Sequence, residues 1–150
     1  MQRGFMIVKG YEDKNINLPI RSTLNSAGYD IEAAEDIKIH PFKLGDKPTL
    51  VSTGLKVYMN DDECLFLINR SSGPKKGLVL ANSVGIIDSD YYGNQDNDGV
   101  IMYAFYNFFD KDLEIKKGDV IGQAIFRKFY KVDDDYAETE RTGGFGSTSK

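Results

Sequence analysis

Short runs of apolar or alternating apolar and polar residues recur along the whole chain, and residues that favour turns separate them. These runs occupy residues 6–8, 29–33, 37–40, 54–59, 64–69, 77–82, 100–109 and 119–130. Turn signals such as His40-Pro41 and Asp98-Gly99 stand between them. No window of helical length has a clear apolar stripe at a 3.6-residue period, although residues 71–77 fit one short helical turn. The pattern therefore predicts a mostly β fold, either a barrel or a sandwich.

The run at residues 100–109 differs from the others because it is apolar at nearly every position. A strand with two apolar faces is normally covered on both. We therefore expect the core on one side of this strand and a neighbouring subunit on the other. The acidic segments at residues 96–99 and 133–135 are expected to be solvated turns.

The composition, with 150 residues of which 41% are hydrophobic and 28% charged, fits one globular domain. We assign residues 1–139 to its folded body and residues 140–150 to a glycine-rich lid segment of the same domain. No stretch approaches the roughly 18 apolar residues of a membrane span, and no signal peptide is evident, so we expect a cytoplasmic protein. The net charge of -4 argues against a broad nucleic-acid-binding surface. The single cysteine, Cys64, is expected to be buried and inert, and the single histidine, His40, to be structural.

The last eleven residues, ERTGGFGSTSK, have a composition suited to holding a ligand. Glycines let backbone N–H groups approach a ligand closely, and Arg141 offers a planar fork that matches phosphate. Phe145 offers a flat face for a base, and Ser147 and Thr148 add hydroxyls. The segment thus fits the triphosphate and the ring of a nucleotide. The alternative is a disordered glycine-rich terminus.

Two further segments place polar groups beside core strands. In NRSSG (69–73), a cation, two hydroxyls and a glycine follow the strand directly, which fits a phosphate cradle or, alternatively, a plain surface turn. In residues 80–94, Asn82 and Asp88 flank a short apolar stretch that predicts a tight β-hairpin able to present backbone groups to a flat ligand. The alternative here is that Asp88 and Tyr91 only belong to a turn capped by aspartate side chains.

Together with AGYDIEAAED (27–36) and KKGDVIGQ (116–123), these segments resemble the five motifs of the homotrimeric dUTP pyrophosphatases, or dUTPases. The likeness runs from residue 27 to residue 149, and GIIDSDYYGN and GGFGSTS are its most specific parts. It implies a subunit folded as a distorted β-barrel or jelly roll, the dUTPase-like β-clip, with a flexible C-terminal tail. It further implies a homotrimer with active sites at subunit interfaces, each closed by a tail that often comes from another subunit. The apolar stretch at residues 100–109 is similar to members from Gram-positive bacteria and their phages.

The resemblance implies hydrolysis of dUTP to dUMP and pyrophosphate by attack of water on the α-phosphorus, which limits uracil in DNA and supplies dUMP for dTMP synthesis. Asp88 matches the general base, and Tyr91 matches the residue under the deoxyribose that excludes a 2′-hydroxyl. Mg²⁺ is implied as the cofactor, held mainly by the substrate phosphates, with Asp30 acting through water. The remaining substrate contacts implied are Arg70, Ser71, Ser72, Asn82, Gly85, Ile87, Gln123, Arg141, Phe145, Gly146, Ser147 and Thr148.

The chain departs from the family pattern in three places. The interval from Arg70 to Asn82 is one residue shorter than in many relatives, and Asn69 stands where proline is common. Arg141 lies four positions before Phe145, where many relatives have five. The first two differences affect the expected position of the phosphate-binding loop around residues 69–73, and the third affects which group Arg141 contacts.

Two other functions are to be weighed. A dCTP deaminase shares this fold, but it needs a catalytic glutamate on the strand after the hairpin, and DNDGVIMYAFYNFF contains none. The other alternative is a regulatory protein on a dUTPase fold that binds a protein partner according to nucleotide occupancy, as some phage-encoded members do. The combination of Asp88, Tyr91 and Phe145 favours catalysis.

Overall fold

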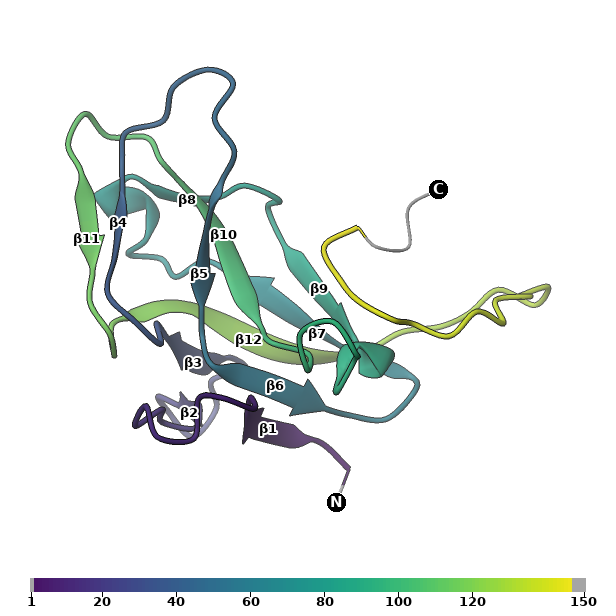
Figure 1. Cartoon of the computed structure of the whole chain (residues 1–150). Helices are drawn as coiled ribbons and strands as arrows, with labels where there is room; N and C mark the ends of the chain where they lie inside the picture. The colour runs from purple at the N-terminus through teal and green to yellow at the C-terminus, as the bar shows by residue number, and fades with distance from the viewer. Residues whose placement is uncertain (1, 147–150) are drawn as a thin grey trace.

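The computed structural model describes residues 2–146, which form a mostly β body with a long C-terminal tail, as predicted (Figure 1). Ser147 and Thr148 lie outside the described residues. The strands are β1 (Gly4–Ile7), β2 (Ile20–Arg21), β3 (Tyr29–Glu32), β4 (Ile37–Ile39), β5 (Thr49–Ser52), β6 (Leu55–Tyr58), β7 (Glu63–Ile68), β8 (Leu78–Leu80), β9 (Gly85–Asp88), β10 (Met102–Asn107), β11 (Leu113–Ile115) and β12 (Val120–Lys128). Two short 3₁₀ helices, η1 (Pro74–Lys76) and η2 (Ser89–Tyr91), follow β7 and β9.

The strands pair in antiparallel fashion into four sheets. The largest has the order β2-β3-β12-β7-β9, and a second has the order β5-β10-β8. Two small sheets, β1-β6 and β11-β4, complete the arrangement within the described residues. The result is a jelly-roll-like stack of sheets whose hydrogen-bonded ladders, over residues 2–146, do not close into one barrel.

The core lies between the two larger sheets. Tyr103 and Phe105 of β10 are almost fully buried and belong to one apolar cluster with residues of β3, β7 and β12. Tyr103 packs against Gly122, where an added Cβ would overlap its ring, and its hydroxyl donates to the carbonyl of Gln123 (2.7 Å). Burial raises the pKa of Tyr103, so this hydroxyl keeps its proton and remains a donor. Through this contact, β10 packs directly against β12.

The run at residues 100–109 is only partly the two-faced strand that its composition predicts. Its strand part, β10, alternates buried and half-buried positions, and the buried Asn107 donates its amide to the carbonyls of Ile39 and Lys111. Phe108 and Phe109 lie beyond the strand and are more than half exposed. Cover by a neighbouring subunit therefore stays a prediction for the half-buried face.

The predicted hairpin around residues 84–87 is wrong in its pairing. β8 pairs with β10 in one sheet, whereas β9 pairs with β7 in the other, so the chain crosses between sheets at residues 81–84. Ser83 has a φ of 63° and stands at this corner. The prediction failed because alternation marks a strand without identifying its partner. Three elements that the apolar pattern missed contain at most two consecutive apolar residues: β2, β5 and β11.

Other local predictions hold. The short helical turn expected within residues 71–77 is η1, which ends at Gly77 with a φ of 82°. Cys64 is buried as expected, and burial raises the pKa of its thiol. Within residues 2–146, no helix is long and apolar enough to cross a bilayer.

Candidate active site

Asp88 is the last residue of β9, at the edge of the five-stranded sheet, where it lies opposite Cys64 of β7. It is also the residue that precedes η2, yet its carboxylate makes no capping hydrogen bond to that helix. The alternative of a simple aspartate-capped turn is therefore wrong for Asp88. Its side chain is 52% exposed and points to other partners.

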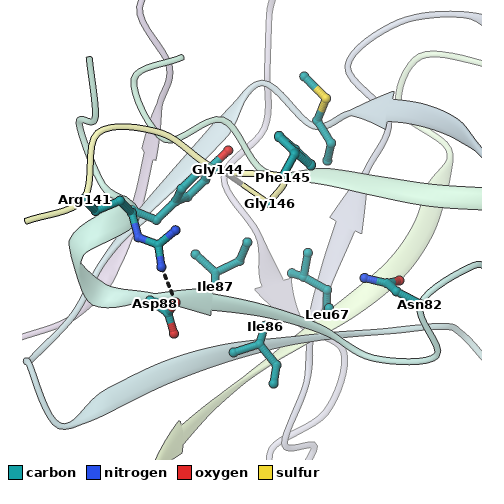
Figure 2. A pocket seen from close by; sticks show the side chains of 12 residues that line it. Leu67, Asn82, Ile86, Ile87, Asp88, Arg141, Gly144, Phe145 and Gly146 are labelled. Carbon is teal, nitrogen blue, oxygen red and sulfur yellow. Dashed lines mark hydrogen bonds and ion pairs between the residues drawn. The ribbon is translucent and has the colours of Figure 1, made fainter. Parts of the chain in front are cut away.

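A pocket of about 320 Å³ lies between β9 and the C-terminal tail, which crosses above the strand (Figure 2). Asn82 and Asp88 stand toward opposite ends of it, and Ile87 points up to the tail while Ile86 points away (Figure 2). The lining residues are Leu67, Asn82, Gly85, Ile86, Ile87, Asp88, Tyr91, Met102, Arg141, Gly144, Phe145 and Gly146. The residues expected to bind the base and the sugar are thus brought together with four residues of the tail.

The tail is held on this pocket by one guanidinium group. Arg141 donates from Nη2 to Asp88 Oδ2 (2.6 Å), from Nε to Asp90 Oδ1 (2.8 Å) and from Nη1 to the carbonyl of Gly143 (3.2 Å). The side chain of Arg141 is only 18% exposed, whereas both carboxylates are more than half exposed. Charge-assisted hydrogen bonds of this kind are among the stronger ones in proteins, so Arg141 docks the tail over the end of β9.

Tyr91 lines the pocket and is 5% exposed. Its hydroxyl donates to the carbonyl of Val100 (2.7 Å), and burial raises its pKa, which keeps the hydroxyl protonated. Gly144 lies directly on the ring, because a Cβ at this position would overlap Tyr91 Cε2. The ring of Phe145 meets that of Tyr91 edge to face at 6.5 Å and remains 61% exposed. The tail thus packs against the Tyr91 ring at Cε2 and leaves the Phe145 ring largely open to solvent.

The residues expected to bind phosphate from outside the tail lie elsewhere. Arg70 turns its guanidinium to the carbonyl of Val120 (3.2 Å) and lines a separate hollow of about 50 Å³ together with Ser72. Ser71 is exposed in the same turn. Gln123 lies in the middle of β12, in register with Asp30 of β3. Among the described residues, none of these four lines the pocket under the tail.

The local surroundings of Asp30 fit a group that positions water. Ser22 donates its hydroxyl to Asp30 Oδ2 (2.5 Å), which orients the carboxylate. Over residues 2–146, no cluster of three or more carboxylate, histidine or thiol groups is arranged to hold a metal ion.

Comparison with known proteins decides what this arrangement is. A family model described as dUTPase matches residues 14–149. The deoxyuridine 5'-triphosphate nucleotidohydrolase of Lactococcus lactis subsp. lactis is 50% identical over 149 residues, which cover 97% of each chain. The crystal structure of the dUTPase from Streptococcus mutans is 42% identical and superposes with a TM-score of 0.80, covering 87% of this chain and 98% of that one. The chain belongs to the dUTPase family.

Its activity is accordingly the hydrolysis of dUTP to dUMP, and the deaminase and regulatory alternatives are disfavoured. A mutant dUTPase of phage phi11 of S. aureus shares the fold at 17% identity, with a TM-score of 0.71 and coverage of 93% of this chain and 98% of that one. The mostly β, jelly-roll-like architecture inferred from the sequence is thereby confirmed as a dUTPase fold.

Several residues of this dUTPase pocket were missed by sequence reasoning. Asp90 was taken as part of a turn, Gly144 as one of several equivalent glycines, and Met102 as part of an apolar run. The acidic segment at residues 96–99 is not simply solvated, because Asn97 donates its amide to the Tyr91 hydroxyl (2.9 Å) and Asp98 pairs with Lys56 (2.8 Å). Asp90 lies inside the specific GIIDSDYYGN motif and residues 96–99 follow that motif closely, which was the available signal for these residues.

Proposed function

We propose that this dUTPase works by attack of water on the α-phosphorus of dUTP, with Asp88 as the general base, to give dUMP and pyrophosphate. The observation that carries the proposal is the position of Asp88, whose carboxylate is half exposed in the pocket and is not used to cap η2. A carboxylate placed in this way accepts a proton from water as the nucleophile forms. Arg141 already contacts it, which brings a phosphate-binding cation to the same point.

We assign recognition of uracil and deoxyribose to the half of the pocket around β9. This strand is the last of its sheet, so one edge of its backbone lacks a strand partner within residues 2–146. Gly85 and Ile87 can therefore present N–H and C=O groups to the edge of a base, with the Asn82 amide beside them. Tyr91 would lie under the sugar and exclude a 2′-hydroxyl by contact with its ring.

We assign the triphosphate to Arg70, Ser71, Ser72 and Gln123 from one chain and to the tail residues. The tail residues proposed to contact the phosphates are Arg141, Gly146, Ser147 and Thr148. Phe145 of the same segment is proposed to stack on uracil. Because the phosphate loop and the pocket under the tail are separate within one chain, we propose that they meet across subunits of a homotrimer. The half-buried outer face of β10 would then be part of the subunit contact. The tail lies on β9 of its own chain in this structure.

Mg²⁺ is proposed as the cofactor. When bound to the triphosphate, it would neutralise charge and hold the α-phosphorus in line with the attacking water. The phosphates would be its main ligands, with Asp30 contributing through a water that its Ser22-oriented carboxylate holds. The structure of the phi11 phage mutant reveals the coordination of a structural Mg(II) ion. We further propose that the enzyme binds dUTP and acts in the cytoplasm. The free thiol of Cys64 would stay reduced there.

The test uses two inactive variants, Asp88→Asn and Arg70→Ala, which damage different halves of the proposed site. If sites form between chains, co-expression of the two should restore about a quarter of the wild-type activity, since random assembly pairs two intact halves at that frequency. Asp88→Asn mixed with Asp88→Ala is the matched control, because both changes lie in the same half of the site and should not complement. Absence of recovery in the first mixture, with mixed trimers present, would contradict a site shared between subunits.

A further inference from the structure

The segment between η2 and β10, residues 92–99, is folded around two asparagine side chains. Asn94 is 7% exposed, and its Oδ1 accepts hydrogen bonds from the backbone N–H groups of Asp96 (3.0 Å) and Asn97 (3.1 Å). Its amide donates to the carbonyl of Tyr91 (2.8 Å) and to Asn97 Oδ1 (2.8 Å). The loop is therefore closed onto the residue proposed to recognise the sugar.

Asn97 links this hydrogen-bonded loop to the Tyr91 side chain. Its Nδ2 donates to the Tyr91 hydroxyl (2.9 Å), while that hydroxyl donates to the carbonyl of Val100 (2.7 Å). The Asn97 Oδ1 is fixed in turn by the N–H of Gly99 (3.0 Å). The far end of the ring thus has two directional bonds, and Asn97 provides one of them from outside the pocket.

The loop is also tied to the rest of the fold. Asp98 Oδ2 accepts from the N–H of Lys9 (3.0 Å) and from Lys56 Nζ (2.8 Å), which belong to the segment after β1 and to β6. Gly99 has a φ of 88°, and an added Cβ would lie 2.8 Å from the carbonyl oxygen of Tyr91. The Asn97 amide is consequently held against a fixed frame and cannot simply follow the ring when the ring is pushed.

We propose that Asn97 is a positioning residue that sets the selectivity of the enzyme for deoxyribose over ribose. The inference rests on the proposed role of Tyr91 as the sugar filter. Steric exclusion of one hydroxyl group works only if the ring does not yield to it, and two bonds at the hydroxyl oppose tilting of the ring. Asn97 acts only through Tyr91 and does not line the pocket described here.

The experiment measures kcat/KM for dUTP and for UTP in Asn97→Ala, Tyr91→Phe and the double variant, with Tm and sedimentation as checks on folding and assembly. Each single variant should reduce the dUTP-to-UTP preference at least about fivefold, the scale of one lost hydrogen bond. The double variant should be no less selective than Tyr91→Phe, because Asn97 has nothing to hold once the hydroxyl is gone. Asn60→Ala, the same change in an exposed turn, should leave the preference unaltered.

Two outcomes would overturn the inference. One is an unchanged preference in Asn97→Ala with equal losses on both nucleotides, which is the signature of a purely structural role. The other is additive loss of selectivity in the double variant. Tyr91→Ala separates this inference from the proposed function. If Tyr91→Ala keeps the dUTP-to-UTP preference of the wild type, Tyr91 is not the sugar filter. If Tyr91→Ala loses the preference while Asn97→Ala keeps it, the role of Asn97 is contradicted and the role of Tyr91 stands.

Discussion

The guanidinium of Arg141 and the carboxylate of Asp88 form an ion pair of 2.6 Å, which joins the C-terminal tail to the end of β9. The same guanidinium also bonds Asp90, so three charged groups meet at one rim of the pocket. A base must be free to accept a proton, and a phosphate-binding cation must be free to meet phosphate. Substrate therefore has to compete with this ion pair, and the tail and the base are coupled through it.

Substitution of the proposed base should separate chemistry from binding. Asp88→Asn keeps the size of the side chain but cannot accept the proton from water, so we expect kcat to fall at least about 100-fold. Nucleotide affinity, measured by calorimetry, should change little. Asp90→Asn is the control, since it removes the other carboxylate that Arg141 contacts and should reduce kcat far less. Similar losses in the two variants would mean that the negative charge, not Asp88 itself, matters.

Removal of residues 140–150 should cripple catalysis while leaving the body of the protein intact. Over residues 140–146, the tail contacts the body mainly through Arg141 and the Tyr91 ring, and none of these residues belongs to the core cluster. We expect an unchanged Tm and assembly state with a loss of kcat/KM for dUTP. Normal hydrolysis by the truncated protein would show that the tail is not a lid.

A single methyl group should test the closed arrangement of the tail. Gly144→Ala introduces a Cβ that overlaps the ring of Tyr91, and overpacking of this kind costs on the order of 1–3 kcal/mol. We expect kcat/KM for dUTP to fall by roughly tenfold for the same reason. Thr142→Ala, at an exposed position of the same segment, should behave as wild type. Equal kinetics in the two variants would contradict close packing of Gly144 on Tyr91 during turnover.

The Asp98 contacts predict a pH-dependent contribution to stability. Partial burial alone would raise the pKa of Asp98, but the bonds from Lys56 and from the N–H of Lys9 outweigh it and hold the pKa below its usual 3.8. Because the folded state favours the charged form, this stabilisation is present above pH 3.8 and is lost as pH falls through the lowered pKa. It should amount to about 1 kcal/mol or less for such a partly exposed pair.

Thermal unfolding of Asp98→Asn and of the wild type at several pH values measures this effect. Asparagine tolerates the left-handed backbone at position 98, where φ is 60°, so the change removes charge with little strain. The Tm of the variant should be lower from pH 5 to 8, and the gap should narrow toward pH 3. A gap that is constant with pH would show that the ionised carboxylate contributes nothing.

The mostly β architecture and the identity of most pocket residues could be predicted from the sequence, because both depend on local patterns. Apolar or alternating runs predicted β7 and β12, and the residues from Asn82 to Tyr91 lie together partly because they are close in the chain. The strand pairing and the tail contacts could not be predicted, because they depend on partners distant in the chain. The pairing of β9 with β7 instead of β8 is one case, and the bridge from Arg141 to Asp90 is another.

Residues 96–99 illustrate why an acidic segment is hard to interpret. Their composition is typical of a solvated turn, and only the folded arrangement brings Asn97 to the Tyr91 hydroxyl and Asp98 to Lys56. Likewise, the glycines of the tail look equivalent in sequence, and only the folded arrangement brings Gly144 against the Tyr91 ring. A long-range contact selects one residue from several that share the same composition.

Product analysis of the purified protein with Mg²⁺ tests the central claim most directly. Separate incubations with dUTP, dCTP, dTTP and UTP are resolved for monophosphate, pyrophosphate and deaminated base. The account predicts dUMP and pyrophosphate from dUTP, and negligible turnover of the other three nucleotides. Release of inorganic phosphate instead of pyrophosphate, deamination of dCTP, or equal hydrolysis of UTP would contradict it.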